Sequence, residues 1–96
     1  MTEAQLEKKL VAFCREHGLL TYKFASPSHR GVPDRIIMGR GKVMFLELKR
    51  PGNKPTALQE REQRRITDCG ICAWWASDWH FIQLTISDFF HLPSGI

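Results

Sequence analysis

Apolar residues recur at helical spacing near the start of the chain. They are Leu6, Leu10, Phe13 and Cys14. Thr2 and Gln5 have the spacing of a capping box, and Gly18 is a typical stop signal beyond the last turn. The pattern therefore predicts a helix over residues 3–17.

Three short apolar runs follow and predict strands over residues 19–24, 35–40 and 42–49. The loop between the first two is rich in Ser, Pro and Gly and ends at Pro33. Gly41 separates the second and third runs, which is typical of a tight hairpin. The third run shows little alternation, as expected for a central strand buried on both faces.

A second capping box, Thr56 with Gln59, opens a strongly polar helix that we expect to run to about Cys69 and to end at Gly70. A fourth strand is predicted over residues 71–76.

The last apolar segment has two interpretations. Asp78 could cap a helix over residues 79–91, whereas a strand over residues 80–85 is the main alternative. The helix would have one apolar side, formed by Trp79, Ile82, Ile86, Phe89 and Phe90. The element order is then helix, three strands, helix, strand and a final helix. We expect one α/β domain over residues 1–96, with a mixed central sheet flanked by helices.

Composition agrees with a folded protein, since 43% of the residues are hydrophobic and 25% are charged. No apolar run is long enough to span a membrane, and the first residues lack the features of a signal peptide. We expect a cytoplasmic protein. Its three cysteines cannot all pair, and Cys69 and Cys72 have no second ligand pair for zinc, so buried structural thiols are expected.

Candidate chemistry is concentrated around the predicted hairpin. Glu47 and Lys49 are two apart in one strand and should project to the same face. Asp34 begins the neighbouring strand and should lie beside them. Two adjacent carboxylates attract a divalent cation with oxygen ligands, such as Mg²⁺ or Mn²⁺. A lysine there could position or help deprotonate an attacking water, or stabilise the transition state of phosphodiester hydrolysis.

A simpler interpretation is a surface ion pair between Glu47 and Lys49, with Asp34 capping a turn. Against it, these charges interrupt the most apolar strand, where burial without a function is costly. The net charge of +4 is compatible with a polyanionic partner but does not identify one.

The same residues resemble a known motif. Pro33-Asp34 followed by Glu47-Leu48-Lys49 is similar to the pattern of the PD-(D/E)xK nuclease superfamily, and the chain looks like a stand-alone VRR-NUC domain of phage or bacterial type. Glu7, the run Arg30-Gly31-Val32-Pro33-Asp34-Arg35 and Gln59 extend the resemblance over nearly the whole chain.

The resemblance implies a restriction-endonuclease-like fold. It implies that Asp34, Glu47 and the carbonyl of Leu48 bind Mg²⁺ or Mn²⁺, and that Lys49 is the catalytic lysine. Glu7 would join the metal site directly or through water; otherwise it is a solvated helix residue. Gln59 would orient the nucleophilic water or a phosphate. Its alternative role is the capping box, and one Gln is not expected to serve both.

Five basic residues flank the acidic pair and are the expected phosphate contacts: Lys23, Arg30, Arg35, Arg50 and Lys54. A second basic group, Arg61, Arg64 and Arg65, alternates with Glu60 and Glu62 and is equally well explained as a solvated helix face. The tryptophans are expected in the core or in an interface rather than in base stacking. Trp74 and Trp75 should face opposite sides of the sheet, leaving one for a partner subunit.

These features predict a metal-dependent DNA endonuclease of a bacterial cell or phage-infected host. Because cutting both strands requires two centres, we expect a homodimer, and the resemblance to junction resolvases suggests branched DNA with four-way junctions. The main alternative is a non-catalytic DNA-binding or assembly module that retains the nuclease fold. A further alternative is an unrelated α/β protein in which the motif occurs by chance.

Overall fold

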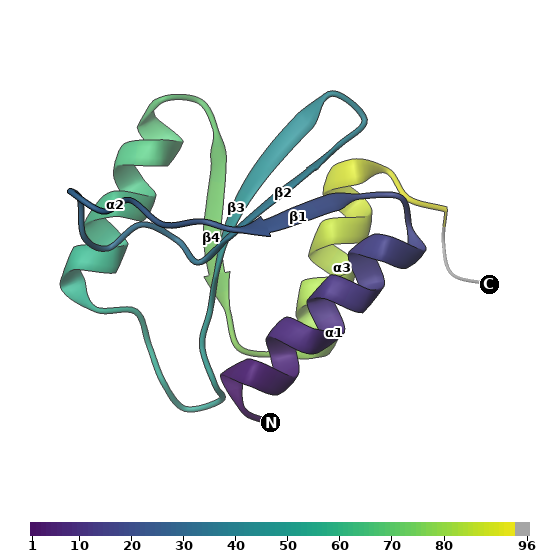
Figure 1. The fold of residues 1–96 in the computed structure, drawn as a ribbon, viewed down its shortest axis with the longest axis horizontal. Helices are drawn as coiled ribbons and strands as arrows, with labels where there is room; N and C mark the ends of the chain where they lie inside the picture. The colour runs from purple at the N-terminus through teal and green to yellow at the C-terminus, as the bar shows by residue number, and fades with distance from the viewer. Residues whose placement is uncertain (94–96) are drawn as a thin grey trace.

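A four-stranded mixed sheet carries helices on both faces in the computed structural model, which describes residues 1–93 (Figure 1). Helices α1 and α3 lie together on one side and α2 lies on the other. The elements in chain order are α1 (Glu3–Glu16), β1 (Leu20–Lys23), β2 (Arg35–Gly39), β3 (Lys42–Leu48), α2 (Ala57–Asp68), β4 (Cys72–Ala76) and α3 (Trp79–Phe90).

The strands follow the order β1-β2-β3-β4. The first three pair antiparallel, and β4 returns parallel to β3 after the crossover through α2. Arg40 and Gly41 form the turn between β2 and β3, both with positive φ, as a two-residue hairpin turn requires. The predicted hairpin, mixed sheet and element order are confirmed.

The final apolar segment is the helix α3, so the alternative of a strand over residues 80–85 is wrong. The side chain of Asp78 accepts a hydrogen bond of 2.8 Å from the N–H of Phe81 and caps the first turn. Ile82, Ile86 and Phe90 are spaced four apart and are all fully buried. A strand would have turned alternate apolar residues away from this core.

The core lies between the sheet and the pair α1 and α3. Its fully buried side chains come from both layers and include Leu6, Leu10, Ile37, Met44, Leu46, Ile82, Ile86 and Phe90. On the opposite face α2 packs mainly against β4, and Val43 and Phe45 of β3 are only half-buried. The expectation that β3 is buried on both faces is therefore only partly met. On this face α2 lies mainly over β4 and leaves the side chains of Val43 and Phe45 partly exposed.

Cysteine positions differ from the expectation of buried thiols. All three thiols are free, and Cys14 is buried in the core, but Cys69 is exposed at the end of α2 and Cys72 is half-buried. Within residues 1–93, no helix combines the length and apolar character that crossing a bilayer requires.

Candidate active site

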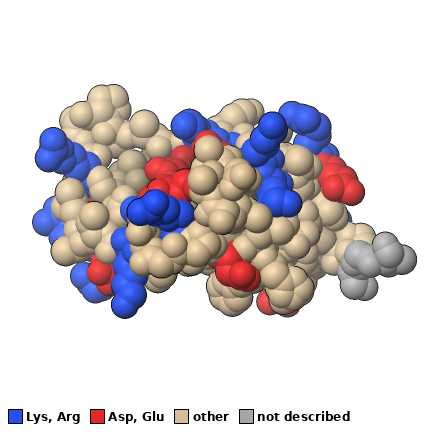
Figure 2. All heavy atoms as spheres, turned by 90° about the horizontal axis from the view of Figure 1, so that it is seen from below, with Lys and Arg blue, Asp and Glu red and all other residues tan. Residues whose placement is uncertain are grey.

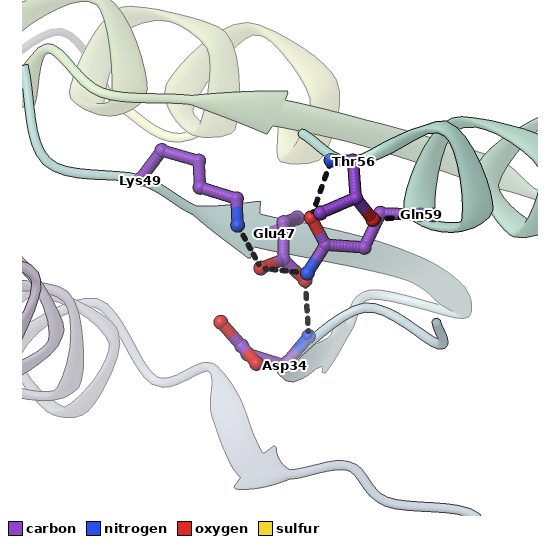
Figure 3. A network of polar contacts seen from close by, with 5 residues as sticks. All are labelled: Asp34, Glu47, Lys49, Thr56 and Gln59. Atoms are coloured by element: carbon purple, nitrogen blue, oxygen red, sulfur yellow. Dashed lines mark hydrogen bonds and ion pairs between the residues drawn. The ribbon is translucent and has the colours of Figure 1, made fainter. Parts of the chain in front are cut away.

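Asp34 and Glu47 lie opposite each other at the end of the β2–β3 hairpin. Arg35 pairs with Leu46, so the next position across the two chains joins Asp34 to Glu47. The backbone N–H of Asp34 donates a hydrogen bond of 3.2 Å to Oε1 of Glu47 (Figure 3). The carbonyl of Asp34 accepts one of 2.6 Å from the N–H of Phe24, which extends the pairing of β1 with β2. Asp34 is therefore fixed by its backbone on both sides.

Lys49 follows the last residue of β3 and faces the same way as Glu47. Its Nζ lies 3.6 Å from Oε2 of Glu47, and both side chains are largely buried. The N–H of Lys49 donates a hydrogen bond of 3.0 Å to the carbonyl of Ala76, which continues the pairing with β4 beyond the strand. The predicted grouping of Asp34, Glu47 and Lys49 is present, at the carboxyl end of a central strand.

Gln59 serves the capping box and the carboxylate group together. Its Oε1 accepts a hydrogen bond of 2.9 Å from the N–H of Thr56, while its Nε2 donates one of 3.2 Å to Oε2 of Glu47 (Figure 3). Thr56 Oγ1 completes the box by accepting from the N–H of Gln59 at 3.1 Å. One amide can make both contacts because it has an acceptor at one corner and a donor at the other, whereas the predicted role of Gln59 in orienting a water or a phosphate stays a prediction.

Glu47 has an unusual electrostatic environment. Burial raises the pKa of Glu47 to about 7; the nearby charge of Asp34 and the proton that the two carboxyls can share act in the same direction. The positive charge of Lys49 and the Asp34 N–H act in the opposite direction and only partly offset the increase. A bound cation would satisfy both carboxylates and keep Glu47 ionised.

A cavity of about 460 Å³ adjoins this group on the side of α1. Its lining includes Glu7 from α1, Lys23 from β1, Asp34 and Leu48. Asp34 thus lies between two sets of residues, Glu47 with Lys49 and Gln59 on one side and Glu7 with Leu48 on the other. Of the donors predicted for a metal ion, Glu47 is hydrogen-bonded to Asp34, while Glu7 and Leu48 share a cavity lining with Asp34.

The donor set fits Mg²⁺ or Mn²⁺ with two carboxylates as its main ligands. Asp34 and Glu47 supply hard oxygen atoms, and Leu48 lines the same cavity as Asp34. Among the described residues, no three Asp, Glu, His or Cys side chains converge tightly enough to form a metal cluster. The carboxylate of Glu7 is held instead by Arg35 at 3.3 Å and by Lys23 at 3.8 Å. This position suits the water-mediated role predicted for Glu7 better than the direct one.

The predicted phosphate contacts occupy different environments. Lys23, Arg30, Arg50 and Lys54 are exposed, on β1 or on the loops before β2 and after β3. Arg35 is only 6% exposed, and its guanidinium is paired with Glu7. To contact a phosphate, the guanidinium of Arg35 would have to bind it together with Glu7 or in place of Glu7. Figure 2 shows a patch of acidic side chains with Lys and Arg on several sides of it, on the face seen from below Figure 1.

Sequence reasoning missed a contact between the loop before β2 and helix α2. Nε2 of His29 lies 2.8 Å from Oε1 of Glu62, which is 4% exposed although it was expected on a solvated face. The hydrogen bond with His29 lowers the pKa of Glu62. Leu58, Glu62 and Ile66 recur every four residues, so the helical period would have predicted that Glu62 faces inward.

Two of the three tryptophans, Trp74 and Trp79, pack against the core. Trp74 is half-buried against the core and makes an edge contact with Phe81, with ring centroids 5.9 Å apart. Trp75, next along β4, is also half-buried and faces the opposite side of the sheet.

Comparisons with known structures agree with this fold. Two solved structures described as a "VRR_NUC domain" and a "VRR_NUC domain protein" superpose with TM-scores of 0.82 and 0.78, at 23% and 18% identity. The first match covers 93% of this chain and 99% of the other, and the second covers 97% and 91%. No family model matches the chain.

A sequence relative shows the family. The chain is 48% identical over 69 residues to "Putative nuclease p44" of Acyrthosiphon pisum secondary endosymbiont phage 1, covering 71% of this chain and 74% of the relative. The fold and the acidic motif define a domain of the VRR-NUC class. The chain belongs to this family, and the phage protein is a relative of it at the sequence level.

Proposed function

We propose that the protein is an Mg²⁺- or Mn²⁺-dependent DNA endonuclease that hydrolyses phosphodiester bonds. The observation that carries the proposal is the juxtaposition of Asp34, Glu47 and Lys49 at the strand ends. Burial and the neighbouring Asp34 raise the pKa of Glu47 to about 7, and a divalent cation between the two carboxylates would offset both effects. Membership of a nuclease family supports the same chemistry.

In this proposal Asp34, Glu47 and the carbonyl of Leu48 hold the metal ion. When bound, the ion supplies an acidified water and stabilises charge that develops on the phosphoryl oxygen. Lys49 holds a positive charge beside the attacking water and the phosphate, while the amide of Gln59 keeps the carboxylate of Glu47 oriented. Glu7 acts through an ordered water, because Arg35 and Lys23 already engage its carboxylate.

The test of catalysis compares variants on four substrates: a four-way junction, a flap, splayed arms and linear duplex DNA, each end-labelled, with Mn²⁺ and with Mg²⁺. Lys49→Ala should reduce cleavage by about 10²- to 10⁴-fold, the usual contribution of a group that assists proton transfer, while DNA binding persists. The matched control is Lys9→Ala, since Lys9 is exposed on α1 and does not line the cavity beside Asp34. Cutting by Lys49→Ala at the wild-type rate would refute the mechanism.

Binding without cutting of all four substrates by the wild-type protein would favour the alternative, a non-catalytic DNA-binding module. Preference for the four-way junction, with symmetric paired nicks, would identify a junction-resolving enzyme, which is the specific activity we propose.

A homodimer is part of this proposal, because paired nicks require two centres. The surface that we propose for the dimer contact lies on the same face of the sheet as α2, over β1, which α2 does not cover. Leu20 and Tyr22 of the edge strand β1 are each 56% exposed there, and Phe45 beside Glu47 is half-buried. Exposed apolar side chains next to an unpaired strand edge favour association.

The test of association is the mass measured by analytical ultracentrifugation. Leu20→Ser with Tyr22→Ser should convert a dimer to a monomer and replace paired nicks by single nicks. Phe81→Ser with Leu84→Ser is the control, because these exposed apolar residues lie on α3, on the other side. A wild-type monomer, or a dimer unaffected by the first pair, would contradict this surface.

A further inference from the structure

The groove between α1 and β1 contains more positive charge than the proposed chemistry uses. It has a volume of about 600 Å³, and its lining includes Lys8 and Arg15 from α1, Lys23 from β1 and Arg35 from β2. Glu7 is the only carboxylate in the lining. Four cations facing one carboxylate make the groove an attractive site for an anion.

The groove is continuous with the cavity beside the acidic pair. Ala4, Glu7 and Lys23 line both spaces, so the carboxylate of Glu7 stands at the boundary between them. Helix α1 and strand β1 are in contact, and Figure 1 shows them meeting at the end where the chain passes from one to the other. An anionic chain that enters the catalytic cavity can therefore continue along α1.

Arg35 supplies a second, independent sign of a missing anion. It pairs directly with Lys23 across β1 and β2, so two cations project to the same face with only Glu7 to neutralise them. The side chain of Arg35 is buried, and its Nε finds no hydrogen-bond partner within residues 1–93. An unsatisfied buried guanidinium nitrogen is costly, and because Nε itself is covered, an anion in the groove would stabilise Arg35 through its negative charge rather than through a hydrogen bond to that atom.

Lys8 and Arg15 extend the positive charge along the helix. They lie on the same face of α1, seven residues or about 10.5 Å apart. That distance corresponds to roughly three base-pair steps measured along the axis of a DNA duplex, at about 3.4 Å of axis per step. Neither side chain forms a salt bridge with any residue of the described chain, so both are available to a ligand.

We infer that this groove binds the phosphodiester backbone of the DNA segment that flanks the scissile bond, with Lys8 and Arg15 as contacts beyond those expected from the sequence motif. The inference rests on the proposed function. The remaining lining favours a regular charged backbone over an acidic peptide. Ala4, Val11 and Ala12 are small and offer no pockets for varied side chains.

The test measures DNA affinity by fluorescence anisotropy at several salt concentrations, with EDTA present so that no cleavage occurs. The logarithm of the association constant falls linearly with the logarithm of the salt concentration, and each lost phosphate contact should make this slope shallower by about 0.9. At 0.15 M salt, each lost contact should also weaken binding about fivefold. Lys8→Gln should show one such loss and Lys8→Gln with Arg15→Gln should show two, or about 25-fold. Both residues are exposed, so these variants should fold normally, which circular dichroism would confirm.

Lys9→Gln is the matched control, because Lys9 is the next residue on α1, is exposed, and does not line the groove. It should keep the wild-type slope and an affinity within about twofold. Equal losses in Lys8→Gln and Lys9→Gln, or an unchanged slope in the double variant, would overturn the inference. So would an oligoglutamate peptide that binds as tightly as DNA and loses the same factor in the double variant.

The binding test of the groove and the cleavage test of the proposed function can succeed or fail independently of each other. Cleavage by the wild-type protein together with an unchanged slope in the double variant would reject the groove and leave the nuclease proposal intact. Loss of two contacts in a wild-type protein that cuts no substrate would support the groove and reject the catalytic proposal.

Discussion

Gln59 is one side chain with two partners, and substitutions can separate its two roles. In Gln59→Glu, the new carboxylate can still accept a hydrogen bond from the N–H of Thr56, since a capping box takes Glu as well as Gln. It cannot donate to Glu47, and it brings a third negative charge beside Asp34 and Glu47. In Thr56→Ala, the cap loses its hydroxyl acceptor, but the amide of Gln59 keeps its contact with Glu47.

The two variants should differ in what they lose. A hydrogen bond to a charged group contributes about 1.5–3 kcal/mol, which corresponds to roughly 10- to 150-fold in a rate constant. We therefore expect Gln59→Glu to slow cleavage by about that factor, because the carboxylate of Glu47 is no longer held in place, while the capping bond to Thr56 is kept. Thr56→Ala should cost about 1 kcal/mol of stability and lower the melting temperature by about 4–8 °C, with nearly unchanged cleavage.

The assay is single-turnover cleavage of labelled branched DNA with Mn²⁺, paired with thermal unfolding followed by circular dichroism. Gln59→Ala completes the set, because it removes both contacts and should show both losses. The reasoning fails if Gln59→Glu cuts at the wild-type rate, or if Thr56→Ala slows cutting as much as Gln59→Glu does.

Three further predictions concern stability and reactivity. The pKa of Glu47 is raised from 4.5 to about 7 in the folded protein, so between these two pH values the folded chain keeps a proton that the unfolded chain has lost. The free energy of unfolding of the metal-free protein should therefore fall as pH rises from 4.5 to 7, and Glu47→Gln should remove that trend. Gly31→Ala should destabilise more than Gly18→Ala in chemical denaturation: both have positive φ, but only at Gly31 would a Cβ come within 2.9 Å of α2 atoms. An aromatic disulfide reagent should modify exposed Cys69 first and Cys14 only on unfolding, because burial raises the pKa of Cys14 to about 11; equal rates would contradict this order.

The sequence alone determined the acidic centre of the candidate site. A two-residue turn fixes the register of β2 and β3, and that register brings Asp34 opposite Glu47. The strand period of two then puts Lys49 on the same face as Glu47. Both capping boxes were equally predictable, because their partners lie three residues apart. All of these relations depend on short stretches of chain and standard backbone geometry.

The tertiary structure decided how the surrounding residues use their polar groups. Gln59 reaches Glu47 because the crossover to parallel β4 brings the start of α2 beside the end of β3, a placement that no local pattern specifies. Arg35 is buried against Glu7 for a similar reason, since α1 packs over strands that follow it by many residues. Contacts of this kind depend on the packing of whole elements, so the sequence supplied the residue types but not their partners.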